Sequence, residues 1–223
     1  MYLSRIDLKA RDLPIQMVIK AQESGLYAAH QWLWQLLAEQ GGEVESAKRA
    51  FLFRQEEVEG GWQFYLLSSE VPNQAHNLFR VSSKPFTPML ESGQRLQFSL
   101  RANPVITRNG KRSDVLMDAK FHAPEDLAPA ELWLRQEAAA KAWLMRQGDK
   151  HGFDLVPEQL RVSGYHQHGP RKPRSKKEVR FSSVDYDGLL QVTEPECFVA
   201  ALANGFGKCK GLGCGLMLIR RPV

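Results

Sequence analysis

The sequence has 223 residues, 43% hydrophobic and 25% charged, with a formal net charge of +5. This length is enough for one large domain or two small ones, and without an apolar run of roughly 18 residues we expect no membrane-spanning helix. The three cysteines, an odd number without zinc-site spacing, argue against a disulfide framework or a structural metal. We therefore expect a cytoplasmic protein without a cofactor.

The first part of the chain predicts the order strand, helix, strand, strand, helix, strand, which is the ferredoxin-like arrangement. The strands are expected at residues 1–9, 50–55, 62–68 and 85–90. The first helix is expected at 26–37, closed by Gly41-Gly42, and a second, short helix at 71–80, where the pattern is weaker. Gly60-Gly61 marks the turn before the third strand.

The second part repeats this rhythm without a clear sequence repeat. Strands are expected at residues 94–103, 160–165, 180–193 and 216–220, and helices at 129–147 and 195–203. Gly148 is expected to stop the first of these helices and Asn204-Gly205 the second. Residues 180–193 read as one long strand or as a pair with a turn at Asp187-Gly188. We therefore predict an α+β protein of two tandem ferredoxin-like domains, residues 1–92 and 93–223.

The excess positive charge is concentrated in residues 171–180. This segment holds six basic residues and one acid, so the remaining 24 basic and 24 acidic residues cancel. A concentrated basic patch is typical of a protein that binds a phosphate backbone. The alternative is a solvated loop or a localisation tract, and the charge alone does not separate the two.

The helix at 26–37 carries the best candidate for catalysis. Its core-facing side is Leu- and Ala-rich, and Tyr27, His30 and Trp34 form a second stripe along the edge of that side. A histidine at such a boundary is reachable and yet held still, which suits proton transfer. The alternative is that all three side chains are ordinary aromatic packing.

Residues 205–215 form a glycine-rich stretch that contains Lys208 and Lys210. The stretch follows a helix and precedes a strand, whereas a dinucleotide or P-loop site needs the opposite order. The sequence therefore argues against a nucleotide cofactor. A cradle for an RNA strand, or close packing against the protein's own helix, remains.

Several short motifs, weak singly but specific in their order, together resemble one family. They are Met1-Tyr-Leu-Ser, Tyr27-x-x-His30 followed by Trp34, Phe51-Leu-Phe-Arg54, Leu100-Arg-Ala-Asn-Pro104, Gly110-Lys-Arg-Ser-Asp-Val115, and Gly205-Phe-Gly207 followed by Gly213-Cys-Gly215-Leu216. This set resembles the CasE-type CRISPR-associated endoribonucleases, the Cascade subunit that cuts repeat RNA into guide units. The resemblance spans nearly the whole chain and implies two ferredoxin-like domains and metal-independent cleavage at a repeat hairpin.

The resemblance also implies roles for individual residues. His30 would be the general acid or base, and Tyr27 would position the scissile phosphate or share proton transfer. Lys177 and Arg180 are our candidates for neutralising the charge of the transition state. The candidates for RNA binding are Arg171, Lys172, Arg174, Lys176, Arg101, Arg112, Lys208 and Lys210. The expected partners are the CRISPR repeat hairpin, to which the protein would stay bound, and other Cascade subunits; no membrane is expected.

Two other functions compete with this hypothesis. A non-catalytic subunit that only holds the guide hairpin would need the basic patch but not Tyr27 and His30. A metal-dependent nuclease would need clustered carboxylates, and the close pairs that we consider as candidates are Glu56-Glu57 and Asp185 with Asp187.

Overall fold

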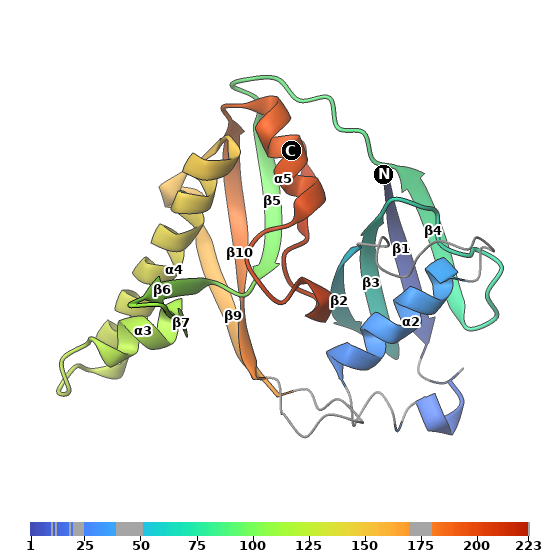
Figure 1. The fold of residues 1–223 in the computed structure, drawn as a ribbon, viewed down its shortest axis with the longest axis horizontal. Helices are drawn as coiled ribbons and strands as arrows, with labels where there is room; N and C mark the ends of the chain where they lie inside the picture. The colour runs from blue at the N-terminus through green and yellow to red at the C-terminus, as the bar shows by residue number, and fades with distance from the viewer. Residues whose placement is uncertain are drawn as a thin grey trace. The chain divides into compact units, whose positions relative to one another are not determined.

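A computed structural model of the protein describes residues 1–9, 11, 13–17, 19, 25–38, 51–169 and 180–222 (Figure 1). The chain divides into two compact units. The first holds the described residues of Met1–Pro88 with Gly169, Arg180 and Lys210–Leu216, and the second those of Met89–His168, Phe181–Cys209 and Met217–Val223. The glycine-rich stretch therefore contributes to both units. The domain boundaries 1–92 and 93–223 stay a prediction.

The first unit is a four-stranded antiparallel sheet with a helix on one face. The strands are β1 (Tyr2–Lys9), β2 (Leu52–Val58), β3 (Gly61–Ser68) and β4 (Phe79–Pro85), and the helix is α2 (Leu26–Ala38). The strand order is β2-β3-β1-β4, with both neighbours of β1 antiparallel to it. This is the order that the predicted ferredoxin-like domain requires, because β1 and β3 lie at the centre of the sheet.

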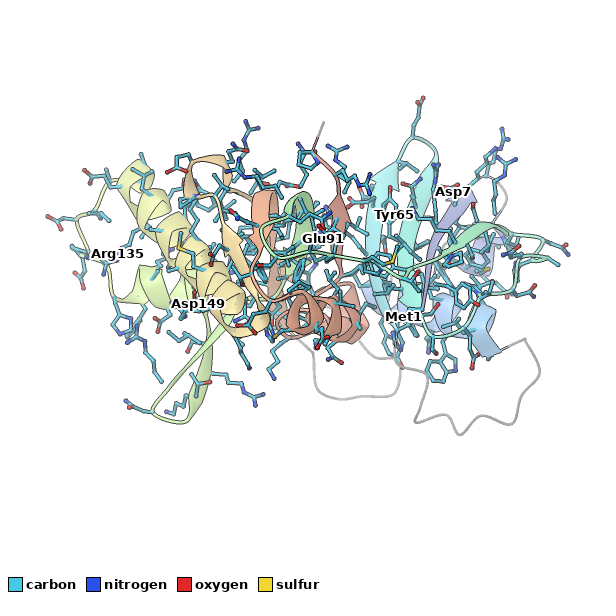
Figure 2. All side chains as sticks on the ribbon, turned by 90° about the horizontal axis from the view of Figure 1, so that it is seen from above. Met1, Asp7, Tyr65, Glu91, Arg135 and Asp149 are labelled. Carbon is cyan, nitrogen blue, oxygen red and sulfur yellow. The ribbon has the colours of Figure 1, made fainter. Side chains whose placement is uncertain are left out.

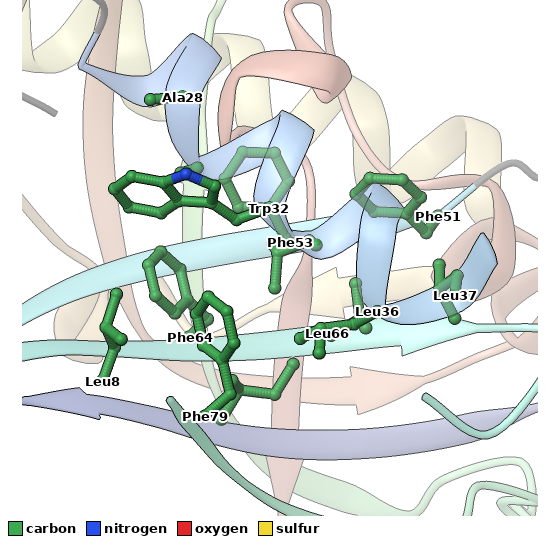
Figure 3. Packing of buried hydrophobic residues seen from close by; sticks show 13 residues of the cluster. Leu8, Ala28, Trp32, Leu36, Leu37, Phe51, Phe53, Phe64, Leu66 and Phe79 are labelled. Atoms are coloured by element: carbon green, nitrogen blue, oxygen red, sulfur yellow. The ribbon is translucent and has the colours of Figure 1, made fainter. Parts of the chain in front are cut away.

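The core of this unit lies between α2 and one face of the sheet (Figure 3). Strand alternation sends Ile6 and Leu8 of β1 and Phe64 of β3 to this face, and all three are at most 1% exposed. From α2, Leu33 and Leu36 meet them and are completely buried. The helix forms because its apolar residues recur every three to four positions and find this face to cover.

The predicted helix at 71–80 is wrong. Residues 71–78, all of which the structure describes, form bends and irregular chain, and β4 begins at Phe79. Local side-chain hydrogen bonds replace helical ones: Asn73 Oδ1 accepts from the Ala75 N–H at 2.9 Å, and His76 Nδ1 accepts from the Leu78 N–H at 3.1 Å. The edge strand consequently occupies 79–85, earlier than the predicted 85–90.

The second unit has the same sheet plan with more insertions. Its strands are β5 (Arg95–Ala102), β6 (Val105–Arg108), β7 (Lys111–Asp114), β8 (Phe153–Leu155), β9 (Arg161–His168), β10 (Phe181–Val192) and β11 (Met217–Arg220). Its helices are α3 (Val115–Phe121), α4 (Pro129–His151) and α5 (Pro195–Asn204). The main sheet runs β11-β5-β10-β8, with β9 also paired to β10, and β6 and β7 form a separate hairpin.

Two details of the second unit differ from expectation, and the long-strand alternative for residues 180–193 is confirmed. Helix α4 runs through Gly148 to His151 and ends at Gly152, whose φ of 75° provides the left-handed cap. Gly148 serves close packing, since a Cβ there would lie 2.3 Å from the Phe153 carbonyl oxygen. Residues 181–192 form one long strand, so Asp187-Gly188 is not a turn. Helix α3, capped by the Asp114 side chain, was not predicted.

None of the helices in the part of the chain that the structure describes is both long and apolar enough to cross a membrane.

Candidate active site

The first unit places Tyr27 and His30 one turn apart on α2, and both side chains are half-buried. Their neighbours Ala28, Ala29 and Leu33 are buried in the core below. His30 therefore lies at the border between the core and the surface, as the helical pattern predicts.

Aromatic rings hold the His30 imidazole in place. It stacks on Phe51 with ring centroids 4.9 Å apart and planes inclined by 20°. Phe53 and Trp34 complete the surround, with centroids 6.2 and 6.4 Å from that of the imidazole. Phe51 and Phe53 are 8% and 0% exposed, so both rings are held in the close-packed core. The imidazole has little freedom to turn away from this position.

The glycine-rich stretch covers another side of the imidazole. Its single 3₁₀ turn, Lys210–Leu212, packs against α2 and β2. A Cβ added to Gly211 would lie 3.8 Å from His30 Cε1 and 3.9 Å from His30 Nδ1. Nδ1 is itself buried. His30 as a whole is half-buried, so part of the residue other than Nδ1 is exposed.

Gly213 fixes this turn on the unit. Its φ is +78°, and an added Cβ would lie 3.3 Å from Phe53 Cε2 and 3.6 Å from Leu26 Cδ2. Only glycine adopts this backbone without strain. Of the two roles left open for the glycine-rich stretch, close packing against the protein's own helix is therefore present. The motif also contributes to the histidine site, which the sequence did not reveal because the contact joins residues about 180 positions apart along the chain.

Five of the six basic residues of the segment 171–180 lie outside the described residues. These are Arg171, Lys172, Arg174, Lys176 and Lys177. Arg180 is described and exposed, directly before β10. Their roles stay predictions.

Arg101 forms a bidentate ion pair inside the second unit. Its Nε and a terminal guanidinium nitrogen donate to the two carboxylate oxygens of Asp185, at 2.7 and 2.9 Å. The two residues are directly opposite each other on β5 and β10. Beside them β9 bulges, and Gly164 (φ +59°) leaves room for the Asp185 carboxylate. This pair gives Arg101 a structural role, whatever else it contacts.

The other predicted RNA-binding residues are distributed over both units. Arg112 is exposed on the β6–β7 hairpin, whose turn at Asn109 and Gly110 has positive φ at both residues. Lys208, also exposed, forms an isolated bridge with Asn103 in the second unit. Lys210 is half-buried and belongs to the first unit.

One carboxylate of each of the two candidate pairs is engaged with an arginine: Glu56 pairs with Arg54, and Asp185 pairs with Arg101. Within the described ranges, no group of three or more His, Cys, Asp or Glu side chains is placed to hold a metal ion.

Perturbed pKa values in the second unit have structural causes. Burial lowers the pKa of His168, and the nearby charges of His166 and Arg101 lower it further, while Asp185 acts in the opposite sense. The His168 ring stacks on Phe181 with centroids 4.6 Å apart, and its Nε2 lies 2.8 Å from Ser183 Oγ. Burial raises the pKa of Asp114, whose carboxylate accepts hydrogen bonds from Ser182 and from the Met117 N–H. Both groups are tied into the sheet and its adjoining helix.

The two sheets place the protein in the class of tandem ferredoxin-like folds. Its candidate site is a histidine that lies between aromatic rings and the glycine turn. The chain belongs to the family of CRISPR-associated proteins, which it matches over residues 1–221. It is 27% identical to the CRISPR system Cascade subunit CasE of Escherichia coli K12 over 228 aligned residues, covering 97% of this chain and 98% of that one. It is also 31% identical over 157 residues to the CRISPR-associated endoribonuclease Cse3 of Thermus thermophilus, covering 61% and 60% of the two chains.

Solved structures share the fold. The CRISPR endoribonuclease Cse3 bound to a 19-nucleotide RNA superimposes with a TM-score of 0.74 at 24% identity, covering 99% of this chain and 100% of that one. The CRISPR-associated protein Cas6e of E. coli K-12 gives a TM-score of 0.58 at 23% identity over the full length of both chains. With the sheet orders described above, these likenesses confirm the predicted fold class of two tandem ferredoxin-like domains.

Proposed function

We propose that this protein is an endoribonuclease that cleaves CRISPR repeat RNA at a hairpin and stays bound to the product as a subunit of a Cascade complex. The family match over nearly the whole chain and the relatives CasE and Cse3 support this activity and these partners. The observation that carries the catalytic part is His30, a half-buried histidine clamped by Phe51 and covered at Nδ1 by the glycine turn.

The proposed chemistry needs no metal ion. The 2′-hydroxyl of the nucleotide before the cut loses a proton and attacks the adjacent phosphorus. The bond from phosphorus to the 5′-oxygen breaks, and that oxygen gains a proton. The products are a 2′,3′-cyclic phosphate and a 5′-hydroxyl. One proton leaves the 2′-oxygen and one reaches the 5′-oxygen, so the step needs only a base, an acid and cations near the phosphate.

His30 carries one of the two proton transfers, as base at the 2′-oxygen or acid at the 5′-oxygen. Its Nε2 is the atom that meets the RNA, because Nδ1 is buried beside Gly211. The ring is already oriented by Phe51, so little ordering is required when the substrate binds. Tyr27, one helical turn away, positions the scissile phosphate or shares the proton transfer. Lys177 and Arg180 remain the candidates for neutralising the phosphorane charge.

The test separates cleavage from binding. His30→Ala is expected to abolish cleavage of the protein's own repeat RNA and to leave hairpin affinity within a few-fold, because most affinity comes from phosphate contacts elsewhere. His76→Ala is the matched control, since His76 is another half-buried histidine of the first unit and packs on Phe79 outside the site. Cleavage by His30→Ala at a rate near that of wild type would remove His30 from the mechanism. Tight hairpin binding without cleavage by the wild type would favour a purely RNA-binding subunit.

A further inference from the structure

A groove of about 370 Å³ lies in the second unit between α3, α4 and the strand β6. It is built entirely from described residues of this unit and shares none of them with the histidine site. Four residues of α4 line it, at positions 135, 139, 142 and 146. This spacing of four, three and four places them on one face of the helix. Figure 2 labels Arg135 on this helix.

The floor of the groove is apolar. It consists of Ala139 and Ala142 of α4, Ala119 and Val115 of α3, and Ile106 of β6. Alanines leave space that larger core residues would have filled, and they offer neither donors nor acceptors. The flat, apolar face of a ring system could therefore lie on these alanines without burying a polar group that lacks a hydrogen-bond partner.

Three arginines also line the groove. Arg108, Arg135 and Arg146 come from β6 and from two positions of α4, and the one acid in the lining is Asp118. Asp118 is only 11% exposed and pairs with Arg108 Nε at 3.1 Å. A terminal nitrogen of Arg135 donates to the His122 carbonyl oxygen at 3.0 Å. These bonds orient two guanidinium groups and use only one of the five N–H donors of each. The lining keeps an excess of two positive charges.

We propose that this groove holds one unpaired nucleotide of the bound RNA. The base lies on the alanine floor, and the adjoining phosphate is bound by the arginines. Guanidinium groups suit both parts, since they stack on bases and bind phosphate oxygens in pairs. The volume is within the range of small-molecule sites. The exposed hairpin residues Lys111 and Arg112 extend the positive surface from Arg108. The inference rests on the proposed RNA-processing function and adds to it a separate subsite for a single nucleotide.

The test uses the full chain with adenosine 5′-monophosphate as the probe, and binding is measured by equilibrium dialysis. Wild type should bind the nucleotide saturably, and adenosine or inorganic phosphate alone should bind at least about tenfold more weakly, because each supplies only half of the contacts. Two variants should lose binding by about tenfold or more: Ala139→Leu, which fills the floor without changing charge, and Arg146→Ala, which removes a cation. Lys150→Ala, which removes a cation from α4 outside the groove, is the matched control and should bind as wild type does.

A competition links the groove to RNA. The complete repeat RNA should displace the probe, whereas a blunt duplex of the stem alone should not. No saturable nucleotide binding, or binding that survives both groove variants, would overturn the proposal. If inorganic phosphate displaced the probe as well as unlabelled nucleotide does, the groove would be an anion site only, and the proposal would be overturned as well. Repeat RNA cleavage is measured on the same preparations, so loss of the groove proposal with cleavage intact is distinguishable from failure of the RNA-processing function.

Discussion

Gly213→Ala should loosen the glycine turn that covers His30. The residue has a φ of +78°, where an L-residue is strained by about 1–2 kcal/mol. The new Cβ would also lie 3.3 Å from Phe53 Cε2, and Phe53 is completely buried and cannot move aside freely. For a chain of this length, the strain alone predicts a melting temperature lower by roughly 2–8 °C. Cleavage should fall by roughly 10- to 100-fold, because small displacements of a catalytic group are costly.

Gly211→Ala is the matched comparison two residues away. Its φ lies outside the left-handed region, and its new Cβ would make ordinary contacts with the imidazole at 3.8 and 3.9 Å. The melting temperature should be unchanged or slightly higher, as for other strain-free Gly→Ala changes. Thermal unfolding and single-turnover cleavage, measured on both variants, test whether Gly213 anchors the turn. Equal melting temperatures, or a more stable Gly213→Ala, would refute the argument that Gly213 anchors the turn.

Three further predictions concern the second unit and the basic segment. Folding lowers the pKa of His168, so the contribution of this residue to the free energy of unfolding is complete above the unfolded pKa of about 6.5 and is lost as the pH falls from that value toward the folded pKa. In urea titrations, the free energy of unfolding of His168→Gln should therefore depend less steeply on pH than that of wild type. Parallel curves would contradict this prediction. Asp185→Ala should lower the unfolding free energy by about 1–3 kcal/mol in urea, because Arg101 loses both bonds; no change would show that the pair is dispensable. Replacing four basic residues of 171–180 with Ala should weaken hairpin binding and flatten the slope of log affinity against log salt by roughly three units; equal affinity along parallel lines would make the segment a solvated loop. The four are Arg171, Lys172, Arg174 and Lys176.

Periodicity predicted the regular elements where burial is one-sided. In β5 and α2, apolar residues recur at the period of the element, and both elements are close to their predicted ranges. It failed at 71–80, where Asn73 and His76 form local hydrogen bonds that compete with a helix. Whether an Asn or His side chain binds the local backbone or points to solvent depends on the tertiary structure around it.

The sequence alone does not distinguish a glycine that ends a helix or strand from one that allows close packing within it. Gly148 continues α4, because its missing side chain admits the Phe153 carbonyl. Gly152, four residues later, ends the helix with positive φ. Similarly, Gly188 lies within β10, where an added Cβ would approach the Gln159 carbonyl oxygen at 3.0 Å. In each case, the deciding partner is brought into place only by the folded chain.

The histidine site was predictable in part. The helical spacing placed Tyr27 and His30 at the edge of the core, because both follow from one helix. The stacking of Phe51 on His30 and the approach of Gly211 depend on contacts between distant parts of the sequence. The burial of Nδ1, from which we infer that Nε2 is the reacting nitrogen, depends on the same contacts.

The proposed cleavage of repeat RNA needs no metal ion and depends on His30. The most direct measurement incubates wild type and His30→Ala with the protein's own end-labelled repeat RNA in excess EDTA and identifies the new 3′ end. Wild type is expected to cleave at one position and to leave a 2′,3′-cyclic phosphate, whereas His30→Ala is expected to bind the hairpin without cutting it. A requirement for magnesium, a 3′-hydroxyl product, or unimpaired cleavage by His30→Ala would contradict it.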